Sequence, residues 1–572
     1  MKAFAKLILP CFFLFSNFLY AETNNNISSE GAYDKAQAMR SSAYKFIDAN
    51  KIQKSEETLE AALNFVRQPD IVAMYQENQY LAGRQWDILR DLIIVNALQQ
   101  DKPNALSYLR QLTKAKKSLA RIAKDEDVAA LLAEETLFVN AVKAEKAWAR
   151  IQANDGLSSP YTENLSDAEK IAGLSTIWSE AKHGFVYFDQ VPSLDWDKLY
   201  QNTIPKVLNT QSTLAYYREL ERFIAQLKDS HSDISYPKAL RSKAYSRPPF
   251  RTRLIEDKVI VTDIYSKSLG ELGIAIGDEL LEIEGQAVHQ YATEHKKPFN
   301  SSSTLQDLEV RTYRYTLLSG DSEKNLNIKL KKADGSHKNL SVPREGYSDT
   351  RYPEANEFTL LESGIAYFRT NSFASNKAAE HFKNILPQLK NAKGLIIDVR
   401  QNGGGSSTVG FRILQYLTDK AVSGSYSYSR LNQPVRKAWG DNRTHWKDLG
   451  GNDLYRTAKK QFDKPVMVLA GPQSFSAAED FLVAFKQLQR GLIIGETSAG
   501  SSGQPLVFEL PGGGSARVCV KRDQYSNGDD WVGVGIAPDI VVKESVEDVR
   551  AGVDVVLDAA EEKVLEGFRA RN

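Results

Sequence analysis

The segment from Lys464 to Gly500 constrains the fold more than any other part of the sequence. Residues 466–470 form a short apolar run between a proline and a glycine, and residues 491–495 form a second one. Between them, residues 477–488 carry apolar side chains at helical spacing. Two buried strands joined by a helix indicate a parallel sheet covered by helices.

Ser476 falls where the first of these strands has ended and the helix begins. A hydroxyl at this place lies beside the free N–H groups at the positive end of a helix, and such donors stabilise the charge that develops in acyl transfer. The spacing Ser476-x-x-Glu479 is equally that of a capping box, in which the serine only caps the helix. The local pattern leaves both interpretations open.

The N-terminal 21 residues predict a cleaved secretory signal. Lys2 and Lys6 precede an apolar core that ends at Ala21. The alternative, a membrane anchor, is disfavoured because the run is short for a span and contains Pro10. We therefore expect an exported protein, periplasmic, at the cell surface or secreted, with no integral membrane span in the mature chain. That chain keeps only Cys519, so it has no internal disulfide.

Length and composition predict a multidomain α+β protein. The 572 residues allow roughly three or four domains, and the net charge of +1 favours neither a nucleic-acid nor a strongly acidic partner. Hydrophobic periodicity divides the mature chain into four parts. These are a helical N-terminal region (22–155), a helical unit (156–247), a β-rich module (248–345) and an α/β domain (346–572).

The β-rich module contains the run Ser268 to Gly285, which resembles the PDZ signature GD-x-(I/L)-L-x-I-(N/E)-G. PDZ modules bind chain ends by adding an extended peptide to a sheet edge. The alternative is a PDZ fold used only as a spacer or lid.

The α/β domain opens with a strand at 364–369 and a helix from Asn376 that we expect to stop at Pro387. A strand at 393–400 then runs into Gly403-Gly404-Gly405, where backbone N–H groups can approach a ligand closely. This loop lacks the Lys-Ser/Thr ending of a phosphate-binding P-loop.

Four motifs in order resemble the family of C-terminal-processing (tail-specific) serine peptidases, which includes the tricorn core. They are the PDZ signature and the runs Asp398–Gly405, Ser474–Glu479 and Gly533–Ile540. The resemblance implies a ClpP/crotonase-like catalytic sheet and Ser476 as nucleophile. It also implies an oxyanion hole from the amides of Ala477 and Gly404, and no metal or organic cofactor.

The general base is where the sequence departs from the better-known members. Their G-E-x-x-x-G-K step ends in a lysine, but here Ser501 follows Gly500. The tricorn-like branch instead uses a Ser-His step just ahead of its PDZ module, and Ser230-His231 matches it. The resemblance therefore implies His231 as the base, with Ser230 beside it. An imidazole suits this role because its pKa lies near working pH.

The carboxylate that orients the base is open. The tricorn-like branch places a glutamate at the position that holds Val532 here. Asp530 lies two residues earlier, hence on the same face if the segment is a strand, and is the favoured candidate. Asp523 and Glu496 are the alternatives.

These features predict an exported serine endopeptidase that cleaves polypeptides through an acyl-enzyme. The PDZ-like module would recruit substrate tails or gate the cleft. The first alternative is an inactive pseudopeptidase that binds peptides or apolar ligands, motivated by the missing lysine and the displaced carboxylate. The second is an adaptor whose sheet domain is only a scaffold.

Overall fold

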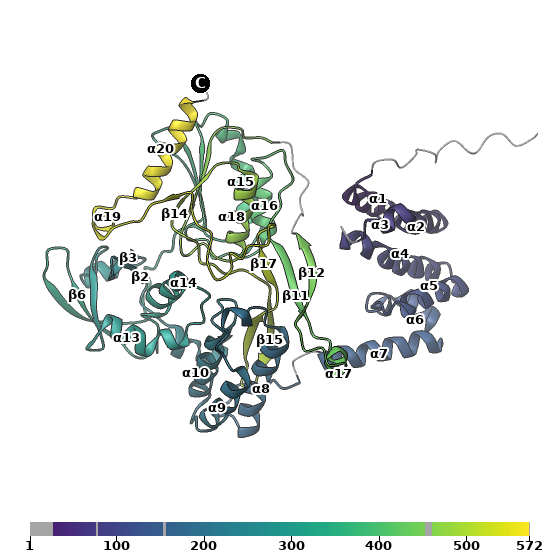
Figure 1. Ribbon diagram of the computed structural model, residues 1–572, viewed down its shortest axis with the longest axis horizontal. Coiled ribbons are helices and arrows are strands. Elements are labelled where there is room, and N and C mark those ends of the chain that lie inside the picture. The colour runs from purple at the N-terminus through teal and green to yellow at the C-terminus, as the bar shows by residue number, and fades with distance from the viewer. Residues whose placement is uncertain (1–26, 76–77, 153–155, 452–459, 571–572) are drawn as a thin grey trace, which may run out of the picture. The chain divides into compact units, whose positions relative to one another are not determined.

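The computed structural model of the protein describes residues 27–75, 78–152, 156–451 and 460–570 (Figure 1). The predicted signal sequence, 1–21, lies outside these residues. The chain divides into two compact units, Met1–Ala153 and Asn154–Asn572. Within the described ranges, the structure contains no helix that combines the length and the apolar character needed to cross a membrane.

The first unit is built of helices, as its apolar periodicity predicts. Its core consists of side chains at helical spacing, among them Leu59, Leu63, Leu89 and Leu92. The helices are α1 (Ser29–Asp48), α2 (Ile52–Val66), α3 (Pro69–Ala73), α4 (Gln79–Leu98), α5 (Lys102–Lys114), α6 (Glu126–Leu132) and α7 (Thr136–Gln152).

The second unit begins with helices that share a core with the main sheet. They are α8 (Asp167–Gly184), α9 (Trp196–Leu208), α10 (Thr213–Ile224) and α11 (Arg241–Tyr245). The buried face of α10 includes Tyr216, Leu220 and Phe223, which belong to the same apolar cluster as the sheet residues Leu395 and Val468. This helical unit is therefore packed onto the sheet domain, and the chain leaves α10 in a buried turn at 229–232.

The β module is an antiparallel sheet with short helices. The strands run in the order β2-β3-β4-β6-β7, with β5 paired to β4. Their bounds are Phe250–Ile255, Lys258–Ile264, Glu279–Ile283, Leu326–Lys331 and His337–Val342, and β5 is Gln286–Ala287. The helices are α12 (Lys267–Glu271), α13 (Val288–His295), α14 (Leu305–Glu309) and a π-helical turn, η6 (Val310–Thr316).

The main sheet has the order β18-β14-β13-β10-β9-β8, and all its pairs are parallel except β8 with β9. The strands are β8 (Asn356–Leu360), β9 (Ala366–Thr370), β10 (Leu395–Asp398), β13 (Val466–Ala470), β14 (Leu492–Gly495) and β18 (Ile540–Val541). The predicted parallel sheet is thus confirmed.

Helices cover both faces of this sheet (Figure 1). On β13, Val466 and Val468 share a cluster with residues of α15 (Lys377–Leu389), α16 (Ser407–Leu414) and α18 (Ala477–Leu488). The alternate residues Met467 and Leu469 pack with α20 (Val555–Arg569). Burial on both sides explains why these strands read as continuous apolar runs rather than alternating ones.

The prediction that a helix stops at Pro387 is wrong, because α15 continues to Leu389. A proline removes one helical hydrogen bond, here to the carbonyl of residue 383. Residue 383 is exposed, so water can satisfy that carbonyl, while Ile385, Leu386 and Leu389 bury the apolar face that sustains the last turn.

Two small sheets lie outside the main sheet, and one of them joins the helical unit to the α/β domain. One has the order β1-β16-β15, from β1 (Asp233–Ser235), β16 (Gly514–Cys519) and β15 (Pro505–Leu510). The other has the order β12-β11-β17, from β12 (His445–Gly451), β11 (Tyr426–Leu431) and β17 (Arg522–Gln524). Because β1 pairs antiparallel with β16, the turn that carries His231 is fixed to a segment about 280 residues later in the chain.

Candidate active site

Three loops at one edge of the main sheet supply the site. They follow the carboxyl ends of β10, β13 and β14, and they carry Gly404, Ser476 and Ser501 respectively. The carboxyl ends of parallel strands meet at the same edge, which is where open α/β sheets bind ligands.

The backbone of Ser476 is strained. Its φ of 58° and ψ of −122° lie outside the regions that L residues favour, and such a conformation costs on the order of 1–3 kcal/mol. The N–H of Ser476 donates to the carbonyl of Ser501 at 3.0 Å and to Oε2 of Glu479 at 3.2 Å. These bonds hold the sharp turn between β13 and α18, which presents the hydroxyl at the sheet edge.

The hydroxyl of Ser476 contacts an imidazole, since its Oγ lies 3.0 Å from Nε2 of His231. The capping box is also present: Oε2 of Glu479 accepts from the N–H of Ser476, and the N–H of Glu479 donates to the carbonyl of Ser476 at 2.7 Å. The two arrangements that the sequence left open therefore occur together.

His231 is a buried ring, with 3% of its surface exposed. It stacks on Phe475 with centroids 4.6 Å apart and planes 10° from parallel. Burial, and then the positive charges of Arg517 and Arg311, hold the pKa of His231 well below its ordinary value of 6.5. The imidazole is therefore neutral near pH 7, the form that accepts a proton.

The other ring nitrogen contacts a serine. Nδ1 of His231 lies 2.9 Å from Oγ of Ser501. For Nε2 to accept the proton of Ser476, Nδ1 must carry the ring proton and donate it to Ser501. Ser501 thus occupies the place where a triad has its orienting group, and it is the residue that follows Gly500 where the better-known relatives have lysine.

Glu479 lies behind this serine and is completely buried. Its carboxyl group accepts from the N–H groups of Ser476, Gly500 and Ser501 and from the hydroxyl of Ser498, at 2.6–3.2 Å. Burial raises the pKa of Glu479 to about 8, although these four donors lower it. The Glu479 side chain therefore connects the turn that carries Ser476 to the loop that carries Ser501.

The expectation that Asp530 orients the base is not supported. Residues 525–539 contain no strand, because Gly533 and Gly535 turn the chain with φ of 87° and 98°, so the argument from a shared strand face fails. The carboxylate of Asp530 instead accepts from Arg522 and Gln524, each at 2.7 Å.

The two alternative carboxylates also have other partners. Asp523 accepts from the hydroxyl of Ser427 at 2.6 Å and pairs with Lys521 at 2.8 Å. Glu496 lies 3.9 Å from Arg253 of the β module. The structure places no carboxylate of the described residues in hydrogen-bonding contact with the His231 ring.

The expected oxyanion donors differ in availability. Among the described residues, the N–H of Ala477 donates to no acceptor, and it lies at the N-terminus of α18. Gly404 is close by, since a Cβ added there would stand 2.7 Å from Cβ of Ser476, so only glycine fits. The N–H of Gly404, however, donates to Oδ1 of Asn402 at 2.9 Å. Ala477 is thus the free donor beside Ser476.

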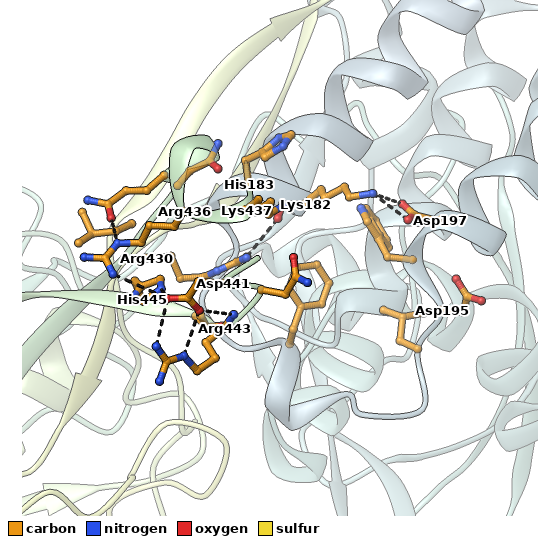
Figure 2. A pocket seen from close by; sticks show the side chains of 18 residues that line it. Lys182, His183, Asp195, Asp197, Arg430, Arg436, Lys437, Asp441, Arg443 and His445 are labelled. Atoms are coloured by element: carbon orange, nitrogen blue, oxygen red, sulfur yellow. Dashed lines mark hydrogen bonds and ion pairs between the residues drawn. The ribbon is translucent and has the colours of Figure 1, made fainter. Parts of the chain in front are cut away.

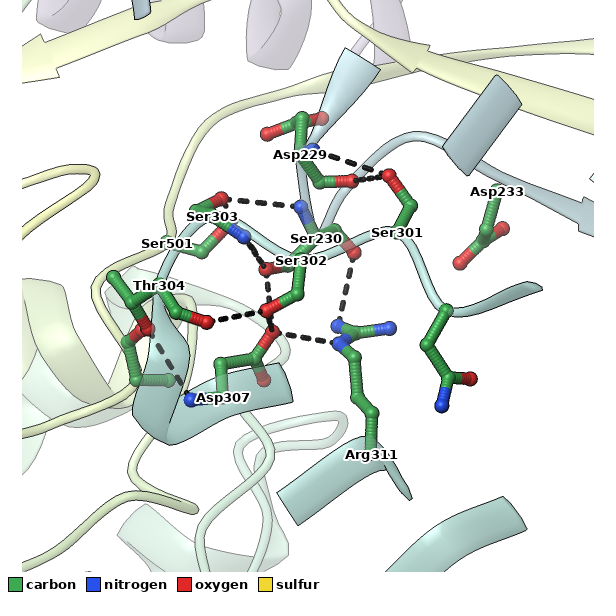
Figure 3. A network of polar contacts seen from close by, with 12 residues as sticks. Asp229, Ser230, Asp233, Ser301, Ser302, Ser303, Thr304, Asp307, Arg311 and Ser501 are labelled. Atoms are coloured by element: carbon green, nitrogen blue, oxygen red, sulfur yellow. Dashed lines mark hydrogen bonds and ion pairs between the residues drawn. The ribbon is translucent and has the colours of Figure 1, made fainter. Parts of the chain in front are cut away.

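Ser230 does not contact the imidazole, but it anchors the turn that carries it. Its hydroxyl donates to Oδ2 of Asp307 at 2.6 Å, and the same oxygen accepts from Ser302 and from Nε of Arg311 (Figure 3). Nη2 of Arg311 also donates to the carbonyl of Ser230 at 3.0 Å. We call Asp307 and Arg311 the brace.

The brace lies in residues 304–311 of the β module, and this segment also reaches the Ser501 loop. The hydroxyl of Thr304 donates to the carbonyl of Ala499 at 2.6 Å, and the guanidinium of Arg311 lies 5.5 Å from the centre of the Phe475 ring. Residues 304–311 therefore contact the turn that carries His231, the loop that carries Ser501 and the turn that carries Ser476. Neither Asp307 nor Arg311 belongs to a motif that the sequence singled out.

A serine hydroxyl on a strained turn, a buried neutral imidazole and a free amide at a helix N-terminus define a site of the serine-peptidase class. Comparison with known proteins finds a family match over part of the chain. Residues 364–542 match the model of peptidase family S41.

Three curated relatives share part of the chain. The C-terminal processing peptidase, chloroplastic, of Tetradesmus obliquus is 24% identical over 296 residues, covering 51% of this chain and 58% of that protein. The carboxy-terminal-processing protease of Bartonella bacilliformis is 27% identical over 211 residues (35% and 44%). The carboxy-terminal processing protease CtpB of Bacillus subtilis is 24% identical over 296 residues (50% and 53%). The chain thus spans about half the length of these relatives.

A solved structure supports the fold. The crystal structure of mature CPAF superposes with a TM-score of 0.56 at 17% sequence identity, covering 71% of this chain and 98% of that one. At this identity the likeness speaks for the fold alone.

Proposed function

We propose that the protein is a serine endopeptidase that cleaves polypeptides through an acyl-enzyme. The contact between Ser476 Oγ and His231 Nε2 at 3.0 Å carries the proposal, because it joins two residues 245 positions apart in the geometry that proton transfer requires. The names of the relatives support cleavage near the carboxyl ends of substrates. The charged and apolar pattern of residues 1–21 supports export.

The chemistry follows from the pair and its surroundings. Ser476 Oγ attacks the carbonyl carbon while its proton passes to His231 Nε2, and the Ala477 amide donates to the oxyanion. The imidazolium then gives the proton to the leaving amine, and water, activated by the same ring, releases the acyl group. A second oxyanion donor would come from Gly404 once its amide exchanges Asn402 for the substrate oxygen.

Hydrolysis and active-site labelling test the proposal together. We expect the purified protein to cleave an unfolded polypeptide and to react covalently with a serine-directed fluorophosphonate. A binder that does not cleave is the less supported alternative, since it needs no hydroxyl aligned with a neutral imidazole. Absence of both cleavage and labelling would favour that alternative.

Ser501 is proposed to orient the base, so Ser501→Ala should lower kcat by about tenfold or more, with little change in KM. The variant keeps the backbone N–H that Glu479 binds, so the loop retains its anchor. Asp530→Asn is the matched control, because it removes the carboxylate that sequence reasoning favoured, and it should leave kcat within about twofold. A large loss in Asp530→Asn with a normal Ser501→Ala would reverse the assignment.

The β module is proposed to act on the site through the brace. Asp307→Asn should lower kcat by about tenfold with KM nearly unchanged, because the imidazole turn loses its anchor. Without this carboxylate the charge of Arg311 is less compensated, which lowers the pKa of His231 further and moves the acid limb of kcat/KM to lower pH. Asp307→Glu should restore part of the rate.

Asp349→Asn is the control for the brace. Asp349 also accepts hydrogen bonds from two serines, Ser266 and Ser268 of the β module. It does not touch the turn that carries His231. Equal effects of the two variants on kcat and on the pH profile would show that Asp307 has no special connection to the base.

A further inference from the structure

Two adjoining cavities form a groove between the helical unit and the β11–β12 hairpin. Their volumes are about 360 and 530 Å³, and both are lined by Phe188, Arg430 and Thr444. Figure 2 shows the first, where side chains of the hairpin face those of α8 and α9. A groove of this size accommodates an extended peptide segment rather than a single side chain.

The groove is positively charged although the whole chain is nearly neutral. The first cavity is lined by five Lys or Arg residues against three Asp residues, besides His183 and His445. Two of the aspartates are already paired, Asp197 with Lys182 and Asp441 with Arg443, at 2.7 and 3.0 Å. Arg436 also lies 3.7 Å from Asp441. The excess charge therefore rests mainly on Arg430 and Lys437.

Arg430 lines both cavities and has no carboxylate partner among the described residues. Its Nη1 donates to the backbone carbonyls of Lys182 and Phe185, at 3.2 and 2.8 Å, and its guanidinium lies 5.7 Å from the centre of the Phe188 ring. Burial lowers the pKa of Arg430, which is the mark of a cation that no counter-ion compensates. A carboxylate from a ligand would supply that counter-ion.

Apolar and exposed side chains complete the groove. The second cavity is lined by Phe185, Tyr428 and Trp446, and Trp446 is 39% exposed. Lys437 is exposed and makes no ion pair within the described ranges. Tryptophan, tyrosine and arginine are the residues that most often anchor a bound polypeptide.

The β17 end of the groove is connected through the fold to the turn that carries His231. Its second cavity ends at Arg522 and Gln524 of β17. Three residues before Arg522, the N–H of Cys519 donates to the hydroxyl of Ser232, which is the neighbour of His231. The segment that lines one end of the groove is thus anchored to the turn that carries His231.

We propose that this groove binds an acidic stretch of the substrate polypeptide through its side-chain carboxylates. The inference rests on the proposed peptidase function and adds the class of sequence that the enzyme engages beside the cleaved bond. Side chains fit better than a terminal carboxylate, because the cations are spread along the groove rather than gathered around one point.

Binding is measured on the Ser476→Ala protein, so that no peptide is consumed. Three fluorescent peptides are compared by anisotropy: an acidic peptide with an amidated end, its Gln/Asn counterpart with an amidated end, and the Gln/Asn peptide with a free carboxyl end. We expect the acidic peptide to bind about tenfold tighter than both others, with an affinity that falls as salt rises. Tightest binding of the free-ended peptide would overturn the proposal in favour of terminal recognition.

Charge-neutralising variants locate the binding. Arg430→Gln and Lys437→Gln should each weaken the acidic peptide about fivefold and leave the neutral one unchanged. Lys383→Gln, which removes one exposed charge on α15 outside the groove, should have no effect. Equal weakening by Lys383→Gln would mean nonspecific attraction and would refute the site. Lys437 is exposed, so its variant remains informative if Arg430→Gln does not fold.

Fluorophosphonate labelling of the protein with intact Ser476 separates the two hypotheses. Labelling without preferential binding of the acidic peptide would reject the groove alone. Binding of the acidic peptide without labelling would keep the groove and reject the hydrolytic function.

Discussion

Replacing Ser476 with alanine is expected to lower peptide hydrolysis by about a thousandfold or more, because the acyl-enzyme then has no oxygen to form on. Covalent labelling by a fluorophosphonate should disappear in the same variant. The change removes one atom from a residue whose backbone bonds to Ser501 and Glu479 remain, so the fold should persist. Turnover is followed with an unfolded polypeptide, and folding by circular dichroism.

Ser474→Ala is the matched control for this result. Ser474 lies on the same turn, and its hydroxyl donates to the carbonyl of Val399 at 2.7 Å rather than to the imidazole. We expect this variant to retain labelling at Ser476. Labelling that survives Ser476→Ala, or is lost only in Ser474→Ala, would remove Ser476 from the mechanism.

The second large effect is on pH dependence. The base must be neutral to accept a proton, and the pKa of His231 lies well below 6.5, so the acid limb of kcat/KM should also lie below pH 6.5. Arg517→Gln removes a charge that lowers this pKa, so the limb should move to higher pH. Lys383→Gln, which removes a remote charge, should leave it in place.

His231→Gln should reduce kcat about as strongly as Ser476→Ala, since the two residues act as a unit. The substitution also changes how the stability of the folded state depends on pH. Below pH 6.5 the unfolded chain binds a proton at residue 231 that the folded chain does not, so this residue makes the folded state less stable as pH falls. Urea unfolding at two pH values should show His231→Gln losing less stability on acidification than the parent.

Much of this arrangement could be predicted from the sequence. Continuous apolar runs, which are buried on both faces, predict the parallel sheet. Helix α18 begins and ends where the apolar periodicity predicts. Ser476 and His231 were found through ordered motifs, since no local signal connects residues 245 positions apart. The helix end at Pro387 was misplaced, because the burial of Leu389 decides it and tertiary burial is not visible locally.

The supporting residues were not predictable in the same way. The sequence draws attention to Ser501 only because this position lacks the expected lysine. It draws attention to Glu479 only as part of a capping box. Asp530 was favoured on an assumed strand that two glycines prevent. Asp307 and Arg311 lie in a different part of the chain from the residues they hold, so only the packing of the β module onto the imidazole turn shows their position.

Because the site is divided among distant segments of the chain, it determines when during folding the protein can become active. The proposed nucleophile, Ser476, belongs to the sheet domain, the imidazole to a turn after α10, and the brace to the β module. A chain emerging in order has its imidazole long before its nucleophile, and it completes the pair only when all three segments have docked. We therefore expect the protein to become active only once it has folded, and a partly folded or proteolytically cleaved chain to be inactive.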